Sequence, residues 1–314
     1  MSTILPALFR RIKAPAWQRE RLELADGDFL DLDWARRTDR QPRPLLILSH
    51  GLEGSTDGQY IKGMARLFLR RGYDILAWNF RGCSGEPNRL LRMYHSGASA
   101  DLAAVIKHAL GFRHYKEIAL AGFSMGGNIT LKYVGQRSGR ISRRIKAAVA
   151  FSVPLHLESC AYELALWDRR IYMWQFLRSL RLKLEEKATR FGDQIDVSGL
   201  AHMRTFFEFD DAYTGPLHGF KDARDYWTRS SAINWLADIK IPTLLVNAAD
   251  DPFLGGLCYP AGLARQSPAF YLEVPRHGGH VGFGPADREG QYWSERRAWD
   301  FISDFIPPIS WPGQ

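Results

Sequence analysis

Short runs of apolar residues, each bounded by glycine, proline, asparagine or aspartate, recur along much of the chain. Five of them span residues 45–48, 74–78, 118–121, 147–151 and 243–246. They are too short for helices and lack polar alternation, which predicts strands buried on both faces, as in a parallel sheet. Between several of them, apolar residues recur at helical spacing, within 60–68, 102–110 and 129–134. This alternation predicts an α/β fold with a mostly parallel, doubly wound sheet.

Two segments depart from this alternation. Residues 19–24 and 29–34 flank Asp26-Gly27, a hairpin signal that predicts antiparallel edge strands. Between about residues 155 and 235 the chain is helix-like, rich in aromatic residues and arginine, and without buried-strand runs. We expect this stretch to be a helical cap inserted into a single domain of residues 1–314.

Within the expected cap, apolar residues step by three or four positions. This spacing predicts one apolar helix face formed by Trp167, Ile171, Trp174, Leu177, Leu180 and Leu184. Basic residues fall on other faces of the same segment: Arg169, Arg170, Arg178, Arg181 and Lys183. Such a face usually packs over a pocket while its arginines are solvated, but peripheral contact with an anionic membrane stays open.

Composition excludes several classes of protein. The 314 residues are 46% hydrophobic and 24% charged, as in soluble globular proteins. The net charge of +8 comes without a Lys/Arg block, so we expect no nucleic-acid partner. The longest stretch without a charged residue, 118–131, is too short to span a bilayer. Residues 1–9 are apolar but precede Arg10 and Arg11, the reverse of a secretory signal.

The cysteines point to a reducing compartment. Cys83, Cys160 and Cys258 form no CxxC pair, so neither a disulfide framework nor a zinc–thiolate site is expected. We therefore expect a cytoplasmic protein, and the sequence leaves its oligomeric state open.

The sharpest chemical signal is Gly122-Phe123-Ser124-Met125-Gly126-Gly127, which lies between a predicted strand and a predicted helix. It fits G-x-S-x-G, the turn that exposes a nucleophilic serine. The turn strains the backbone at the serine, and flanking glycines let neighbouring backbone approach without Cβ clashes. The N–H groups of the following helix would stabilise charge on a bound oxygen.

A nucleophilic serine needs a base and an acid, in the chain order Ser, Asp, His for this type of turn. The acidic pair Asp250-Asp251 follows the predicted strand at 243–246. The segment His277-Gly278-Gly279-His280 follows another apolar run at 270–274. An oxyanion hole also needs a backbone N–H from the loop after the strand at 45–48. We assign its two donors to the backbone N–H groups of Leu52 and Met125.

These motifs together resemble the α/β-hydrolase superfamily and, within it, the YheT-like branch of predicted hydrolases. The resemblance covers nearly the whole chain, least securely the cap. It rests on His50-Gly51-Leu52-Glu53-Gly54-Ser55, residues 79–88 (NFRGCSGEPN), residues 122–128 (GFSMGGN), Asp250-Asp251-Pro252-Phe253 and residues 277–283 (HGGHVGF). It implies Ser124 as nucleophile, Asp251 as acid and His280 as base.

Local geometry also favours Asp251 over Asp250 as the acid and His280 over His277 as the base. Asp251 precedes Pro252, which biases it towards an extended conformation that projects its side chain from the turn. Asp250 is then expected to cap the turn. His280 follows two glycines that let its loop approach Ser124, so it is a better base than His277.

The expected function is a serine carboxylic-ester hydrolase that acts through an acyl-enzyme, on small-molecule or lipid esters with an apolar acyl or alcohol group. Acyl transfer on the same triad and a non-catalytic lipid-binding or interaction protein stay open, because fold does not dictate function. No cofactor is expected. No metal site is expected either, since no His-Glu-x-x-His helix accompanies His277 and His280. Asp101 opens a predicted helix and is expected to be its N-cap.

Overall fold

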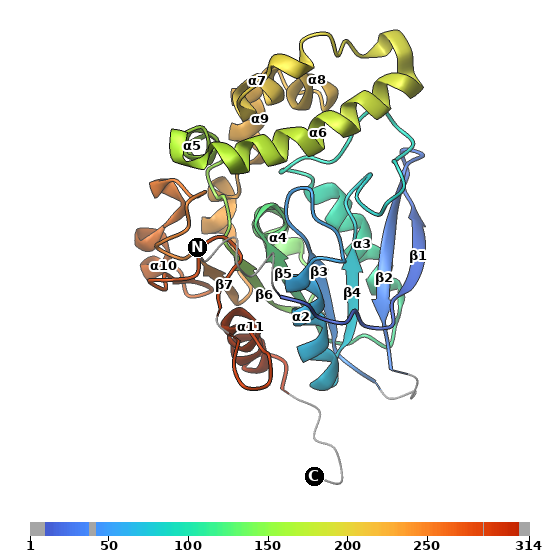
Figure 1. Cartoon of the computed structure of the whole chain (residues 1–314). Coiled ribbons are helices and arrows are strands. Elements are labelled where there is room, and N and C mark those ends of the chain that lie inside the picture. Colours follow the sequence, from blue (N-terminus) through green and yellow to red (C-terminus); the bar gives the residue numbers. More distant parts are fainter. Residues whose placement is uncertain (1–9, 38–41, 285, 308–314) are drawn as a thin grey trace.

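The computed structural model describes residues 10–37, 42–284 and 286–307, and its centre is an eight-stranded sheet (Figure 1). The apolar start of the chain, residues 1–9, lies outside the described residues. The strand order is β1-β2-β4-β3-β5-β6-β7-β8. The strands are β1 Gln18–Glu23, β2 Phe29–Ala35, β3 Leu45–Ser49, β4 Asp74–Trp78, β5 Ile118–Phe123, β6 Ile145–Phe151, β7 Thr243–Val246 and β8 Phe270–Glu273.

The pairing directions follow the two patterns in the sequence. β1 and β2 form an antiparallel hairpin in which Leu22 pairs with Leu30, and β2 also runs antiparallel to β4. From β4 through β3 to β8 every neighbouring pair is parallel. The predicted α/β fold with a mostly parallel sheet is confirmed, and so is the hairpin.

Helices cover both faces of this sheet, because consecutive strand residues point to opposite faces and both sets are apolar. In β3, Leu45 and Ile47 join one buried cluster, whereas Leu46 and Leu48 join the other. One face packs against α2 and α11, and the opposite face packs against α3, α4 and α10. Their bounds are α2 Gln59–Arg70, α3 Ser99–Gly111, α4 Met125–Arg137, α10 Ala261–Gln266 and α11 Trp293–Ser303.

The chain between β6 and β7 forms a separate helical layer, which we call the cap. Figure 1 shows it at one end of the sheet, with the long helix α6 running across it. The cap has its own buried cluster, which includes Met173, Leu177 and Leu184. Its helices are α5 Leu157–Leu164, α6 Arg170–Phe191, α7 Phe206–Phe209, α8 Gly215–Leu217 and α9 Ala223–Ser230, with a π-helical turn at Asp210–Thr214.

The prediction of one apolar face on the cap helix is wrong for its first half. Leu177, Leu180 and Leu184 are buried, but Trp167, Ile171 and Trp174 are 80%, 74% and 55% exposed. The reason is geometric. A step of three residues turns 300° around the helix axis, which is about 60° short of a full circle. The two steps from 174 to 180 therefore move the apolar positions about a third of a circle around the helix, away from the side on which Trp174 lies.

The prediction that Asp101 caps its helix is also wrong. α3 begins at Ser99 with Ala98 as N-cap residue, and Asp101 lies in the first turn. Its carboxylate accepts two hydrogen bonds from the Arg81 guanidinium, at 2.8 Å each, and Arg81 also pairs with Asp28 at 2.9 Å. All three side chains are buried. The sequence gives no sign of this pairing, because the partners are 20 and 53 residues from Arg81.

No helix in the described part of the chain is long and apolar enough to cross a membrane.

Candidate active site

Ser124 occupies a strained turn between β5 and α4, with φ 52° and ψ −120°. Neighbouring backbone approaches so closely that side chains are excluded on both sides of the serine. A Cβ on Gly126 would lie 2.3 Å from the His50 carbonyl oxygen, and one on Gly122 would lie 2.5 Å from the Gly126 carbonyl oxygen. The two glycines of the motif are therefore required by close packing.

The structure brings together the three side chains that the sequence singles out. Ser124 Oγ lies 2.8 Å from His280 Nε2, and His280 Nδ1 lies 2.9 Å from Asp251 Oδ2. Asp251 accepts a hydrogen bond from His280 Nδ1–H, so the ring proton stays on Nδ1 and Nε2 can accept the serine hydroxyl proton. The Asp251 side chain is fully buried and that of His280 is 10% exposed. This arrangement can raise the nucleophilicity of the serine oxygen.

The loop that carries His280 is held in place from both sides. Asp250 Oδ1 accepts hydrogen bonds from the backbone N–H groups of Gly278 and Gly279, at 2.8 Å each. On the other side, the Ser152 hydroxyl accepts one from the Val281 N–H at 2.9 Å. Asp250 therefore caps the histidine loop. The prediction that it caps its own turn is wrong, because the Phe253 N–H in that turn donates to Asp251 Oδ1, at 3.0 Å. The role of Ser152 was missed, because a single serine after a strand carries no sequence signal.

His277 does not take part in this chain of hydrogen bonds. Its side chain is 86% exposed, and its Nδ1 lies 3.5 Å from the Asp250 carboxylate.

The backbone N–H groups assigned to the oxyanion hole belong to residues that line the same cavity as Ser124 and His280. Met125 is the first residue of α4, so its N–H has no acceptor within the helix. The Leu52 loop is fixed by hydrogen bonds to its neighbour Gly51. Tyr60 Oη accepts from the Gly51 N–H at 2.9 Å, and His50 Nδ1 lies 2.7 Å from the Gly51 carbonyl oxygen.

The His50 ring has a defined protonation state. Its Nε2 accepts a hydrogen bond from the Phe80 N–H at 3.1 Å, so its proton lies on Nδ1 and is donated to Gly51. Burial lowers the pKa of His50 to about 3, which keeps the ring neutral. Sequence reasoning assigned His50-Gly51 a backbone role only and missed this bracing of the loop by the ring.

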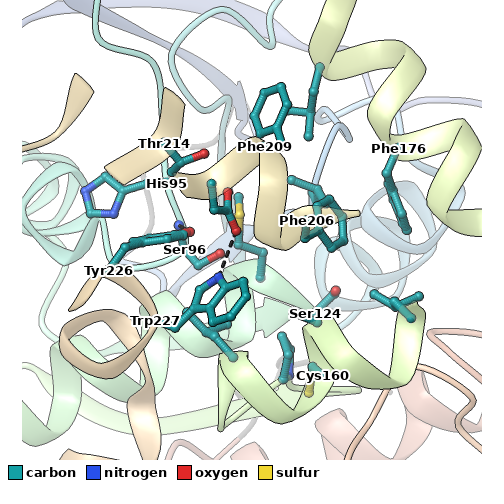
Figure 2. Close-up of a pocket in the computed structure, with 18 of the residues that line it drawn as sticks. His95, Ser96, Ser124, Cys160, Phe176, Phe206, Phe209, Thr214, Tyr226 and Trp227 are labelled. Carbon is teal, nitrogen blue, oxygen red and sulfur yellow. Dashed lines mark hydrogen bonds between the residues drawn. The ribbon is translucent and has the colours of Figure 1, made fainter. Parts of the chain in front are cut away.

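A largely apolar cavity lies above Ser124, between the sheet and the cap (Figure 2). Its internal volume is about 110 Å³. Figure 2 shows Phe176, Phe206 and Phe209 on one side of the cavity, with Tyr226 and Trp227 of the cap helix α9 on the other side. The apolar lining also includes Leu52, Met93, Leu157, Leu164, Leu180 and Phe253.

One carboxylate lines this cavity. Asp210, in the π-helical turn of the cap, accepts a hydrogen bond from Trp227 Nε1 at 2.8 Å. Burial raises the pKa of Asp210 to about 6. The sequence does not mark Asp210 as a cavity residue, because two adjacent acids look like a solvated pair.

Within the described ranges, no group of three or more His, Cys, Asp or Glu side chains is arranged to hold a metal ion. Cys83 is buried, 3.1 Å from Lys183 Nζ, and burial raises the pKa of its thiol to about 11. It is therefore protonated at neutral pH and a poor nucleophile.

Comparison with known proteins identifies relatives over most of the chain. The model of the α/β-hydrolase fold family matches residues 44–287. The Escherichia coli (strain K12) protein YheT, which carries an esterase name, is 36% identical over 98% of this chain and 90% of its own length. Mouse phospholipase ABHD3 is 30% identical, over 85% of this chain and 66% of its own length.

A lipase and a solved esterase structure are also similar to this chain. The monoacylglycerol lipase of Saccharomyces cerevisiae is 28% identical, over 86% of this chain and 61% of its own length. Among solved structures, the Pyrococcus furiosus esterase PF2001 superposes with a TM-score of 0.62, covering 96% of both chains at 15% identity. At that identity the similarity shows the fold alone.

Proposed function

This chain belongs to the α/β-hydrolase fold family, in its YheT-like branch of esterase- and lipase-type hydrolases, and we propose that it is a serine carboxylic-ester hydrolase. Ser124 Oγ attacks the acyl carbon of the ester while His280 Nε2 takes the serine proton. Asp251 holds the imidazole tautomer and stabilises the imidazolium that forms.

The tetrahedral intermediate places negative charge on the former carbonyl oxygen. The N–H groups of Leu52 and Met125 donate hydrogen bonds to this oxygen, which lowers the barrier for its formation. His280 then gives its proton to the leaving alcohol, and the acyl group remains on Ser124. A water molecule, deprotonated by His280, attacks this acyl-enzyme and releases the carboxylic acid.

The observation that carries the proposal is the continuous chain of hydrogen bonds from Asp251 through His280 to Ser124, at the foot of an apolar cavity. A binding protein on the same scaffold has no need of all three groups in this geometry. The apolar lining favours an ester with an apolar acyl or alcohol group. The relatives' names, a phospholipase and a monoacylglycerol lipase among them, favour lipid esters.

Hydrolysis of a panel of p-nitrophenyl and glycerol esters with increasing acyl length tests the proposal. We expect turnover that is lost in Ser124→Ala and kept in Ser198→Ala. Ser198 is an exposed serine, 74 residues after Ser124 in the sequence. Added alcohols or thiols reveal acyl transfer if esters of the acceptor accumulate in place of free acid. Absence of turnover and of acyl transfer on every ester, in folded protein, contradicts the proposed function and favours a binding protein.

A further inference from the structure

The cap carries an exposed apolar surface at the start of its longest helix, α6, and in the turn that precedes it. We call Leu166, Trp167, Ile171 and Trp174 the outer patch, and they are 48%, 80%, 74% and 55% exposed. Of ten large apolar side chains that are exposed in the described part of the chain, seven lie between residues 162 and 207. Exposed apolar residues scattered singly are ordinary, but a cluster of this kind marks a contact surface.

The outer patch is not part of the packing of the cap. α6 has a second apolar stripe, formed by Met173, Leu177 and Leu184, which is buried in the cap's own cluster. The patch lies about a third of a turn away from this stripe, beside a shallow hollow lined in part by Trp167, Ile171 and Trp174. The buried stripe is enough to pack α6 against the rest of the cap, so the exposed residues of the outer patch are available for a partner.

The charges around the outer patch are mostly positive. Arg170 and Arg178 are exposed, and the Arg178 guanidinium lies 5.6 Å from the centre of the Trp174 ring. Arg181 lines the hollow and donates to the Met203 carbonyl oxygen. The acidic residues between positions 163 and 181 are Asp168, which is exposed, and Glu163, which pairs with Arg169 at 2.7 Å. Two exposed acids, Glu185 and Glu186, follow further along α6.

We propose that the outer patch docks on an anionic lipid surface, with Trp167, Ile171 and Trp174 inserted among the headgroups. Tryptophan beside arginine on one side of a helix is the pattern of an interfacial amphipathic segment. A second copy of the chain fits less well, because a two-fold symmetric contact would place the same arginines face to face. The net charge of +8 also favours approach to an anionic surface.

The docking would bring lipid next to the cavity. Leu164, at the end of α5, lines both the hollow beside the outer patch and the cavity above Ser124. The helices that contact the lipid are thus the same ones that enclose the cavity. The docking itself requires no chemistry at Ser124, so it can be tested apart from the proposed hydrolysis.

Co-sedimentation with vesicles tests the docking. The vesicles contain ether-linked phosphatidylcholine, with or without ether-linked phosphatidylglycerol, so that no ester is available for hydrolysis. We expect wild-type protein to bind the phosphatidylglycerol vesicles and to be released by salt. Trp167→Ser combined with Ile171→Ser should weaken binding at least tenfold, through loss of buried apolar area. Arg170→Gln combined with Arg178→Gln should weaken it about thirtyfold.

Matched controls are available on other elements. Leu257→Ser and Tyr271→Ser remove exposed apolar side chains, 55% and 43% exposed, from outside the cap. These variants should bind as wild type does. Docking can also be measured on the wild-type protein, by quenching of its tryptophan fluorescence with brominated ether lipids. We expect the tryptophan emission to fall when these lipids are present in phosphatidylglycerol vesicles.

Three results would overturn the proposal. One is the absence of binding and quenching with both kinds of vesicle, and another is wild-type binding by the folded outer-patch variant. The third is a protein that does not bind vesicles but forms a dimer in solution, which the Trp167 and Ile171 substitutions dissociate. That result would assign the patch to a second copy of the chain.

Discussion

Replacing the two adjacent acids one at a time separates the proposed catalytic carboxylate from its neighbour. Asp251 Oδ2 accepts a hydrogen bond from His280 Nδ1–H at 2.9 Å. In Asp251→Asn, an amide N–H facing Nδ1 would force the ring proton onto Nε2. That nitrogen could then no longer accept the proton of Ser124. Loss of this tautomer costs about four orders of magnitude in kcat, or about 5.4 kcal/mol in the activation barrier.

Asp250 is expected to behave differently, because its Oδ1 only accepts N–H groups of the histidine loop. An asparagine oxygen can accept the same two hydrogen bonds, so Asp250→Asn should keep kcat within about fivefold, given that the partly exposed charge contributes about 1 kcal/mol or less. Asp250→Ala removes the oxygen that accepts both hydrogen bonds. At about 1 kcal/mol for each of the two lost hydrogen bonds, we expect a loop that is displaced more often and a kcat lowered by up to about thirtyfold.

The assay is kcat on one p-nitrophenyl ester for the three variants and wild type, with thermal melts to exclude unfolding. The expected order is wild type, Asp250→Asn, Asp250→Ala and, far below, Asp251→Asn. An inactive Asp250→Asn beside an active Asp251→Asn would show that the acid is assigned one residue too late. Equal activity of all four proteins would refute the triad itself.

Three further predictions concern packing and charge. Gly126→Ala should abolish both folding and activity, because its Cβ would meet a carbonyl oxygen at 2.3 Å, whereas Gly139→Ala, with no atom within 4 Å of its Cβ, should retain the wild-type melting temperature and turnover. Burial raises the pKa of Asp210 from 3.8 to about 6, so the native state holds a proton that the unfolded chain has lost and stability falls as pH rises through that window. Asp210→Asn should therefore raise the melting temperature at pH 8 and leave it unchanged at pH 3. Arg81→Met leaves two buried carboxylates unpaired and should lower the free energy of unfolding in urea by about 3–5 kcal/mol.

The features that the sequence predicts correctly are local. A strand of four or five apolar residues, a G-x-S-x-G turn and the hairpin at Asp26-Gly27 each depend on residues within one short window. The order of Ser124, Asp251 and His280 along the chain adds topology to these windows, since each residue follows a predicted strand at the same edge of the sheet.

The features that it does not predict depend on contacts between distant segments. The pairing of Arg81 with Asp101 and Asp28 joins two loops and the first turn of α3. The hydrogen bond from Trp227 to Asp210 joins two segments of the cap that are 17 residues apart. The exposure of Trp167 shows a second limit, because spacing by threes and fours predicts that a helix is amphipathic but does not fix which side of it is covered.

Labelling with a fluorophosphonate, followed by mass spectrometry of the peptides, tests the central claim most directly, because only an activated serine attacks phosphorus at a useful rate. We predict a single adduct on Ser124 in folded protein, lost when His280 is replaced by alanine. An adduct on another serine, or no adduct in folded wild-type protein, would contradict the assignment of Ser124 as the nucleophile.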